Sequence, residues 1–274
     1  MGIRFHYEDF GSGRAFFGLH GWPLDHRHMV AEYEPLFANR SGWRRIYMDL
    51  PGMGQTPGAD WINCQDQMLD VLVGFIEKVA PGERFIVGGT SYGGYLARGL
   101  VYRRSEKMDG MMINVPVAEM DKAKRRLPEH RLIHANPDFL AALEADEQEM
   151  KEPGSTLSAQ SVPALEHLRK YYKPAGAIAD DAFLERVSKQ SSFSFTVDVL
   201  PQPFDAPSLI LTGRFDHWCG YREAYSLLDQ YTRATFAVLD RADHALVVEE
   251  NNLFLALAND WLDRVEEYIK DRGN

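Results

Sequence analysis

Short apolar runs that end in turn residues recur along the chain of 274 residues. Glycine, proline or aspartate follows each run within two positions. Runs of this length with such boundaries are typical of buried strands. We therefore predict six strands, at residues 15–19, 45–48, 84–87, 111–115, 209–211 and 235–239.

Longer segments with apolar residues three and four positions apart lie between these runs, which is the pattern of amphipathic helices. They span residues 66–79, 95–102, 223–231 and 251–269. Strands that alternate with helices imply crossover connections and a mostly parallel sheet. Ligands of such sheets bind beyond the carboxyl ends of the strands, so we expect the functional residues in the turns that follow the strands.

One segment breaks the alternation. Residues 117–200 contain no convincing strand, carry many charges and helix-forming residues, and are punctuated by prolines. We predict a helical insertion at 117–200 between two halves of one core, formed by residues 1–116 and 201–274. The basic cluster in the insertion is interpreted as a solvated helix face, because acidic residues follow it closely.

The composition argues against several classes of protein. The formal net charge is −10, which argues against nucleic-acid binding. No apolar stretch approaches the ~20 residues of a membrane-spanning helix, and the first residues lack the pattern of a signal peptide. Cys64 and Cys219 are too few for a disulfide framework, so we expect reduced thiols and a cytoplasmic location. The oligomeric state cannot be inferred from the sequence.

A nucleophile motif follows the strand at 84–87. Residues 89–93 read Gly-Thr-Ser-Tyr-Gly, a G-x-S-x-G pattern between a strand and a helix. Gly89 and Gly93 leave room for the tight turn that presents Ser91, and the start of the following helix favours developing negative charge.

A serine nucleophile needs a base, and the base needs an orienting carboxylate. Asp216 follows the strand at 209–211, and His244 follows the strand at 235–239. The chain order Ser91, Asp216, His244 is the order that this architecture uses. Glu119, after the strand at 111–115, is the alternative for the acid.

Residues 20–23, His-Gly-Trp-Pro, follow the first predicted strand. A small residue there lets the backbone pass close to the nucleophile. The backbone N–H groups of Trp22 and Tyr92 are then the predicted oxyanion hole. His20 is interpreted as a structural histidine.

Taken together, these motifs resemble the α/β-hydrolase fold superfamily over essentially the whole chain: residues 20–23, Asp49-Leu-Pro-Gly-Met-Gly54, the turn at Ser91, Asp216 and His244. The resemblance implies an α/β fold with a mostly parallel central sheet flanked by helices, and it identifies residues 117–200 with the helical cap of such proteins. It also implies that Ser91 is the nucleophile, His244 the base and Asp216 its orienting acid.

The sequence departs from the family pattern next to the base. Asp243 stands where the family often has glycine, and it either raises the pKa of His244 or faces solvent. A serine nucleophile argues against dehalogenase and epoxide hydrolase chemistry, which the resemblance links to aspartate. Thr90 and Ala245 differ from the residues usual in carbon–carbon bond hydrolases of the family.

Other residues are weaker candidates for binding a metal, a dinucleotide or the substrate. Residues 25–28, Asp-His-Arg-His, lack a third metal ligand in a rigid frame, so we expect them at the surface or at a pocket rim and predict no metal site. Residues 52–54, Gly-Met-Gly, do not form a dinucleotide fingerprint. Trp22, Trp218 and Phe139 are expected to line the substrate pocket.

The sequence therefore predicts a serine hydrolase that acts through an acyl-enzyme on a small ester-like substrate and requires no metal or organic cofactor. The alternatives on the same triad are an aminopeptidase, a perhydrolase and a carbon–carbon bond hydrolase. A non-catalytic ligand-binding protein on the same scaffold is the alternative from another class. The predicted partner is a small molecule, with no nucleic acid and no membrane.

Overall fold

The computed structural model describes residues 2–151 and 157–273 and contains a seven-stranded sheet. The strands are β1 (Tyr7–Gly11), β2 (Arg14–Leu19), β3 (Trp43–Met48), β4 (Phe85–Thr90), β5 (Met108–Asn114), β6 (Ser208–Gly213) and β7 (Ala234–Leu239). Their order is β1-β3-β2-β4-β5-β6-β7, and only β1 runs antiparallel to its neighbour. The mostly parallel sheet predicted from the sequence is thus confirmed.

Sequence periodicity missed the edge strand β1. Three of its five residues are polar or charged, and four of the five are exposed, because one edge of the strand has no partner strand. It therefore lacks the apolar run that marks the other six strands. Its pairing with β3 extends the sheet beyond the parallel part.

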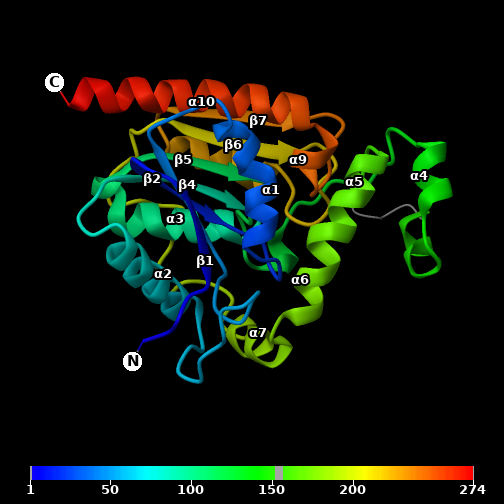
Figure 1. Cartoon of the computed structure of the whole chain (residues 1–274), viewed down its shortest axis with the longest axis horizontal. Coiled ribbons are helices and arrows are strands. Elements are labelled where there is room, and N and C mark those ends of the chain that lie inside the picture. Colours follow the sequence, from blue (N-terminus) through cyan, green and yellow to red (C-terminus); the bar gives the residue numbers. More distant parts are fainter. Residues whose placement is uncertain (1, 152–156, 274) are drawn as a thin grey trace.

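Helices cover both faces of the sheet (Figure 1). On one face lie α1 (His26–Phe37) and α10 (Asn251–Arg272), and on the other lie α2 (Gln65–Val79) and α3 (Tyr92–Arg104). The sequence did not predict α1, whose buried positions include polar side chains. The predicted helix at 223–231 is instead α8 (Arg222–Tyr225) followed by a 3₁₀ turn (Ser226–Asp229), and α9 (Leu246–Glu249) precedes α10.

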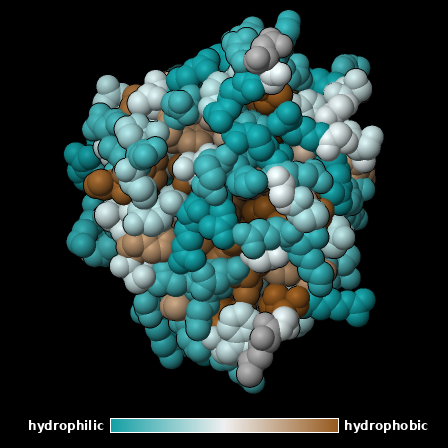
Figure 2. Space-filling view, turned by 90° about the vertical axis from the view of Figure 1, so that its left-hand side faces the viewer, coloured by the Kyte–Doolittle hydropathy of each residue, from teal (hydrophilic) through white to brown (hydrophobic). Residues whose placement is uncertain are grey.

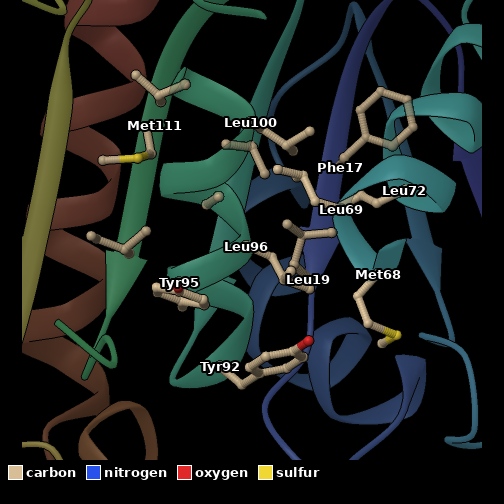
Figure 3. Close-up of a cluster of buried hydrophobic side chains, with 14 of the residues drawn as sticks. Phe17, Leu19, Met68, Leu69, Leu72, Tyr92, Tyr95, Leu96, Leu100 and Met111 are labelled. Carbon is tan, nitrogen blue, oxygen red and sulfur yellow. The ribbon is translucent and has the colours of Figure 1, made fainter. Parts of the chain in front are cut away.

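The packing between α2 and α3 fixes the start of α3, and therefore the turn before it. Figure 3 shows Leu69 of α2 near Leu96 and Leu100 of α3, with Leu19 of β2 next to them. All four leucine side chains are completely buried. Burial of one such side chain contributes about 2 kcal/mol, so this contact holds the helix firmly against the sheet.

The chain between β5 and β6 contains helices and no strand among its described residues. They are α4 (Pro137–Ala142), α5 (Val162–His167), a π-helical turn (Leu168–Tyr172), α6 (Lys173–Ile178) and α7 (Asp181–Ser188), with 3₁₀ turns at Lys122–Lys124 and Ala145–Lys151. Figure 1 shows α4 and α5 projecting to one side of the sheet. By contrast, Phe183 and Val187 of α7 and Phe193 after it pack into the main core.

The surface is mixed in character. On the face drawn in Figure 2, hydrophilic residues predominate and hydrophobic residues form small separate groups. Within the described part of the chain, the helices are too short or too polar to cross a lipid bilayer. Cys64 and Cys219 are both free thiols, and Cys219 is buried.

Candidate active site

Ser91 occupies a tight turn between β4 and α3. Its backbone has a φ of 55° and a ψ of −112°, a conformation in which a side chain is strained. The two flanking glycines are sterically required. A Cβ atom at position 89 would lie 2.5 Å from the carbonyl oxygen of Gly93, and one at position 93 would lie 2.0 Å from that of Leu19. The turn therefore lifts Ser91 above the carboxyl end of the sheet.

The structure brings the three residues of the predicted triad together from three separate turns. The Nε2 atom of His244 lies 3.0 Å from the Oγ atom of Ser91. On the other side of the ring, Nδ1 lies 3.1 Å from Oδ2 of Asp216. These residues follow β4, β6 and β7, whose carboxyl ends meet at one edge of the sheet. Both distances are within hydrogen-bond range for a nucleophile, a base and its orienting acid.

Asp216 is held as a buried anion. Its Oδ1 atom accepts hydrogen bonds from the backbone N–H groups of Trp218 and Cys219, each at 2.9 Å. Burial alone would raise the pKa of Asp216, but the charge of His244 and these hydrogen bonds lower it below its usual value. Burial would conversely lower the pKa of His244, but the negative charge of Asp216 raises it well above 6.5.

The backbone amides of Trp22 and Tyr92, the predicted oxyanion hole, belong to segments next to Ser91. Trp22 follows β2, and a Cβ atom at Gly21 would lie 3.4 Å from that of Ser91, so this loop passes close to the nucleophile. Among the described residues, neither the amide of Trp22 nor that of Tyr92 donates a hydrogen bond.

The side chains of these two residues are also in contact. The Trp22 and Tyr92 rings pack edge to face with their centroids 5.1 Å apart, and the Tyr92 hydroxyl donates to Gln65 over 2.6 Å.

A cavity of about 740 Å³ opens in front of Ser91. The half-exposed indole of Trp218 lies at its wall and stacks on the His244 ring, with ring centroids 5.3 Å apart and planes inclined by 23°. The lining combines apolar, hydroxyl and charged side chains: Trp22, Gln65, Val117, Glu119, Met120, Asp121, Lys122, Lys124, Arg125, Ser188, Ser191, Ser192, Trp218 and Cys219. The three serines in this lining carried no sequence signal, because only tertiary packing brings them to the cavity of Ser91.

The expectation that Phe139 lines this cavity is wrong. Its side chain is buried in a separate cluster with Leu157, Leu165 and Ala245, because it lies on the inner side of α4. Glu119 does line the cavity, but its Oε1 atom accepts from the backbone of Asp121 at 2.8 Å. The carboxylate that contacts the imidazole of His244 is that of Asp216.

Asp243 does not face solvent, which corrects one of the two alternatives from the sequence. It is completely buried, and its Oδ2 atom accepts from Nδ1 of His130 at 2.7 Å and of His217 at 2.8 Å. Burial raises the pKa of Asp243, and the hydrogen bond from His130 and the charge of His217 offset this only in part. The side chain is thus a structural acceptor under the loop of His244.

The expectation of a surface or pocket-rim position for residues 25–28 is wrong for Asp25, His26 and His28, whereas Arg27 is partly exposed. Asp25 caps α1, and the side chains of His26 and His28 are buried beneath that helix. Nδ1 of His26 contacts Oδ1 of Asp49 at 2.7 Å. His20 is completely buried, and both of its ring nitrogens have backbone partners, at Gly21 and Leu50.

The sequence profile of the Alpha/beta hydrolase family matches residues 17–257, which include the strands from β3 to β7, the turn of Ser91 and the turn of His244. This match covers most of the chain. The chain belongs to the Alpha/beta hydrolase family. The family assignment agrees with the sheet order and with the resemblance inferred from the motifs.

Proteins with similar sequences or structures include two esterases and a hydrolase. The chain is 23% identical to a pimeloyl-[acyl-carrier protein] methyl ester esterase of Shewanella woodyi, over 96% of this chain and all of the relative. An alpha/beta superfamily hydrolase of Oenococcus oeni PSU-1 superposes with a TM-score of 0.87 at 26% identity, covering 97% of this chain and 100% of that structure. A thermophilic esterase of Thermogutta terrifontis gives a TM-score of 0.66 at 21% identity, covering 96% and 94% of the two chains.

Proposed function

We propose that this member of the Alpha/beta hydrolase family is a serine hydrolase that cleaves a small carboxylic ester through an acyl-enzyme. The observation that carries the proposal is the continuous chain of contacts from Ser91 through His244 to Asp216, at 3.0 and 3.1 Å. Similarity to an esterase over the full length of that relative supports the same reaction class.

The residues suit both halves of the reaction. The Oγ atom of Ser91 attacks the carbonyl carbon while its proton passes to Nε2 of His244, and the ester oxygen leaves as an alcohol with that proton. Water then gives a proton to the same nitrogen and attacks the acyl-enzyme, which releases the acid and restores Ser91. The amides of Trp22 and Tyr92 would hold the oxyanion, and one such donor is typically worth about 3 kcal/mol.

The segment 117–200 would act as a cap over this site. This segment contributes ten of the residues that line the cavity: seven between positions 117 and 125, together with Ser188, Ser191 and Ser192. The volume of about 740 Å³ suits a small molecule. The mixed lining favours a substrate with a polar part beside its acyl group rather than a long alkyl chain.

The decisive experiment compares the wild type with Ser91→Ala. We expect wild-type protein to hydrolyse a short-chain p-nitrophenyl ester and to be labelled by a fluorophosphonate, and we expect the variant to do neither while keeping its unfolding temperature. Hydrolysis by purified Ser91→Ala would refute the serine mechanism. A folded wild type that is not labelled and does not hydrolyse esters, amides or carbon–carbon substrates would instead support a ligand-binding protein on this scaffold.

A further inference from the structure

A second set of buried polar side chains lies away from the triad, where α1 meets α5. His28 and Glu32 are one turn apart on α1, with exposed fractions of 0% and 4%. His167 is the last residue of α5, in the segment between β5 and β6. The ligand atoms of these three residues, one from each, all lie within 4.8 Å of one another. The arrangement supplies the third ligand that residues 25–28 lack in the sequence.

The histidines of this set have unused ring nitrogens. Both ring nitrogens of His28 and Nε2 of His167 are buried and have no hydrogen-bond partner among the described residues. Nε2 of His28 lies 2.9 Å from Oε1 of Glu32, but without the angle of a hydrogen bond. A buried polar atom without a partner costs about 1–3 kcal/mol, so these unpartnered nitrogens require an explanation.

The other histidine clusters do not share this property. Nδ1 of His26 is paired with Asp49, and Nδ1 of both His130 and His217 is paired with Asp243. In each case a carboxylate already satisfies the ring nitrogen that faces it. The unpartnered nitrogens of His28 and His167 therefore distinguish this cluster as one that can take up a ligand.

We propose that His28, Glu32 and His167 form a binding site for one divalent transition-metal ion of the Zn²⁺ type. Two imidazoles and one carboxylate are a common zinc donor set, with a fourth position left for water, whereas Ca²⁺ and Mg²⁺ prefer oxygen ligands. Ligand atoms of a tetrahedral Zn²⁺ stand roughly 3.4 Å apart. The three donor atoms already lie within 4.8 Å of one another, so small side-chain shifts would bring them into that geometry.

The residues around the three proposed ligands connect this site to other parts of the fold. The second carboxylate oxygen of Glu32 accepts from Oγ1 of Thr90 at 2.9 Å, and Thr90 directly precedes Ser91. His167 continues directly into the π-helical turn Leu168–Tyr172, and such turns frequently mark functional sites. A bound ion would therefore link the helical segment 117–200 to the core and, through Glu32, to the turn of the nucleophile.

The test measures metal binding directly and does not depend on the proposed hydrolase activity. The full chain, with any affinity tag removed and stripped with a chelator, is titrated with Zn²⁺ by calorimetry and then with Co²⁺ by visible absorption. We expect one Zn²⁺ per chain, a higher unfolding temperature and the strong visible bands of tetrahedral Co²⁺. His167→Gln, at a partly exposed position, is expected to weaken binding at least about 100-fold, and Thr90→Val about 10-fold.

Matched histidine variants assign the site. His134→Gln removes an exposed histidine of the same segment and should leave Zn²⁺ affinity unchanged, as should His130→Gln. Circular dichroism verifies that each variant is folded, and His167→Gln remains informative if Glu32→Gln fails to fold. Absence of Zn²⁺ binding by the wild type at millimolar concentration would overturn the proposal. The proposal would also be overturned if His167→Gln kept the Zn²⁺ affinity of the wild type while His130→Gln or His244→Gln lost it.

Discussion

The side chain of Asp243 accepts a hydrogen bond from the backbone N–H of the neighbouring His244, with a donor–acceptor distance of 2.7 Å. The same buried carboxylate accepts from His130, a residue of the 117–200 segment. The backbone N–H of Asp243 donates to the carboxylate of Glu249 over 2.7 Å. The hydrogen bonds of Asp243 therefore stabilise the turn that presents the base. A glycine at position 243 would lack the side chain that accepts two of them.

Replacement of Asp243 by asparagine tests this network. The amide oxygen can still accept from the N–H of His244, but the amide nitrogen can accept from neither His130 nor His217. We expect a loss of about 1–3 kcal/mol in the free energy of unfolding, measured in urea. His130→Ala should lower the free energy of unfolding by less in the Asp243→Asn variant than in the wild type, because His130 has already lost its hydrogen-bond partner there. Additive effects of the two substitutions would contradict a shared network.

Asp216 and Glu119 can be separated as orienting acids. Asp216→Asn removes the charge that contacts Nδ1 of His244 and allows the wrong tautomer of the ring, so kcat should fall by about 10⁴-fold, as in other serine triads. Glu119→Gln should lower kcat far less, because its carboxylate hydrogen-bonds to the backbone of Asp121. The measurement is the steady-state hydrolysis of a p-nitrophenyl ester. A larger loss of kcat in Glu119→Gln would reverse the assignment.

The pH dependence of the reaction should report the environment of His244. The charge of Asp216 outweighs the effect of burial and raises the pKa of His244 well above 6.5. Only the neutral imidazole acts as a base, so kcat/KM should decrease about tenfold per pH unit below that pKa, with its inflection above pH 6.5. Any residual activity of Asp216→Asn should show this inflection at lower pH. An inflection of the wild type below pH 6.5 would contradict the electrostatic account.

The inner strands that lead to Ser91 and Asp216 were predictable because they are buried on both sides. An inner parallel strand such as β4 must be apolar along its whole length, and its end is marked by the glycines that the turn of Ser91 requires. The edge strand β1 and the helix α1 escaped prediction for the opposite reason. Their patterns are broken by exposed polar residues in β1 and by buried polar residues, including His28 and Glu32, in α1.

The surroundings of the triad were less predictable, since they depend on contacts between distant segments. The pairing of His130 with Asp243 joins residues 113 positions apart, and no local pattern encodes it. Phe139 has the aromatic character expected of a pocket residue, but the orientation of α4 turns it into a separate apolar cluster. Sequence order thus identified the reacting groups, whereas packing decides which side chains surround them.

The two glycines Gly93 and Gly74 provide a matched test of the nucleophile turn. Both lie within helices, but a Cβ atom at position 93 would lie 2.0 Å from the backbone oxygen of Leu19, whereas one at position 74 would meet nothing within 4 Å. Gly74→Ala should raise the free energy of unfolding by about 1 kcal/mol, the difference in helix propensity. Gly93→Ala should lower it by about 3 kcal/mol or more, because a backbone oxygen cannot give way as a flexible side chain can. Unfolding in urea measures both changes, and equal stabilisation by the two alanines would show that the turn before α3 is not tightly packed against β2.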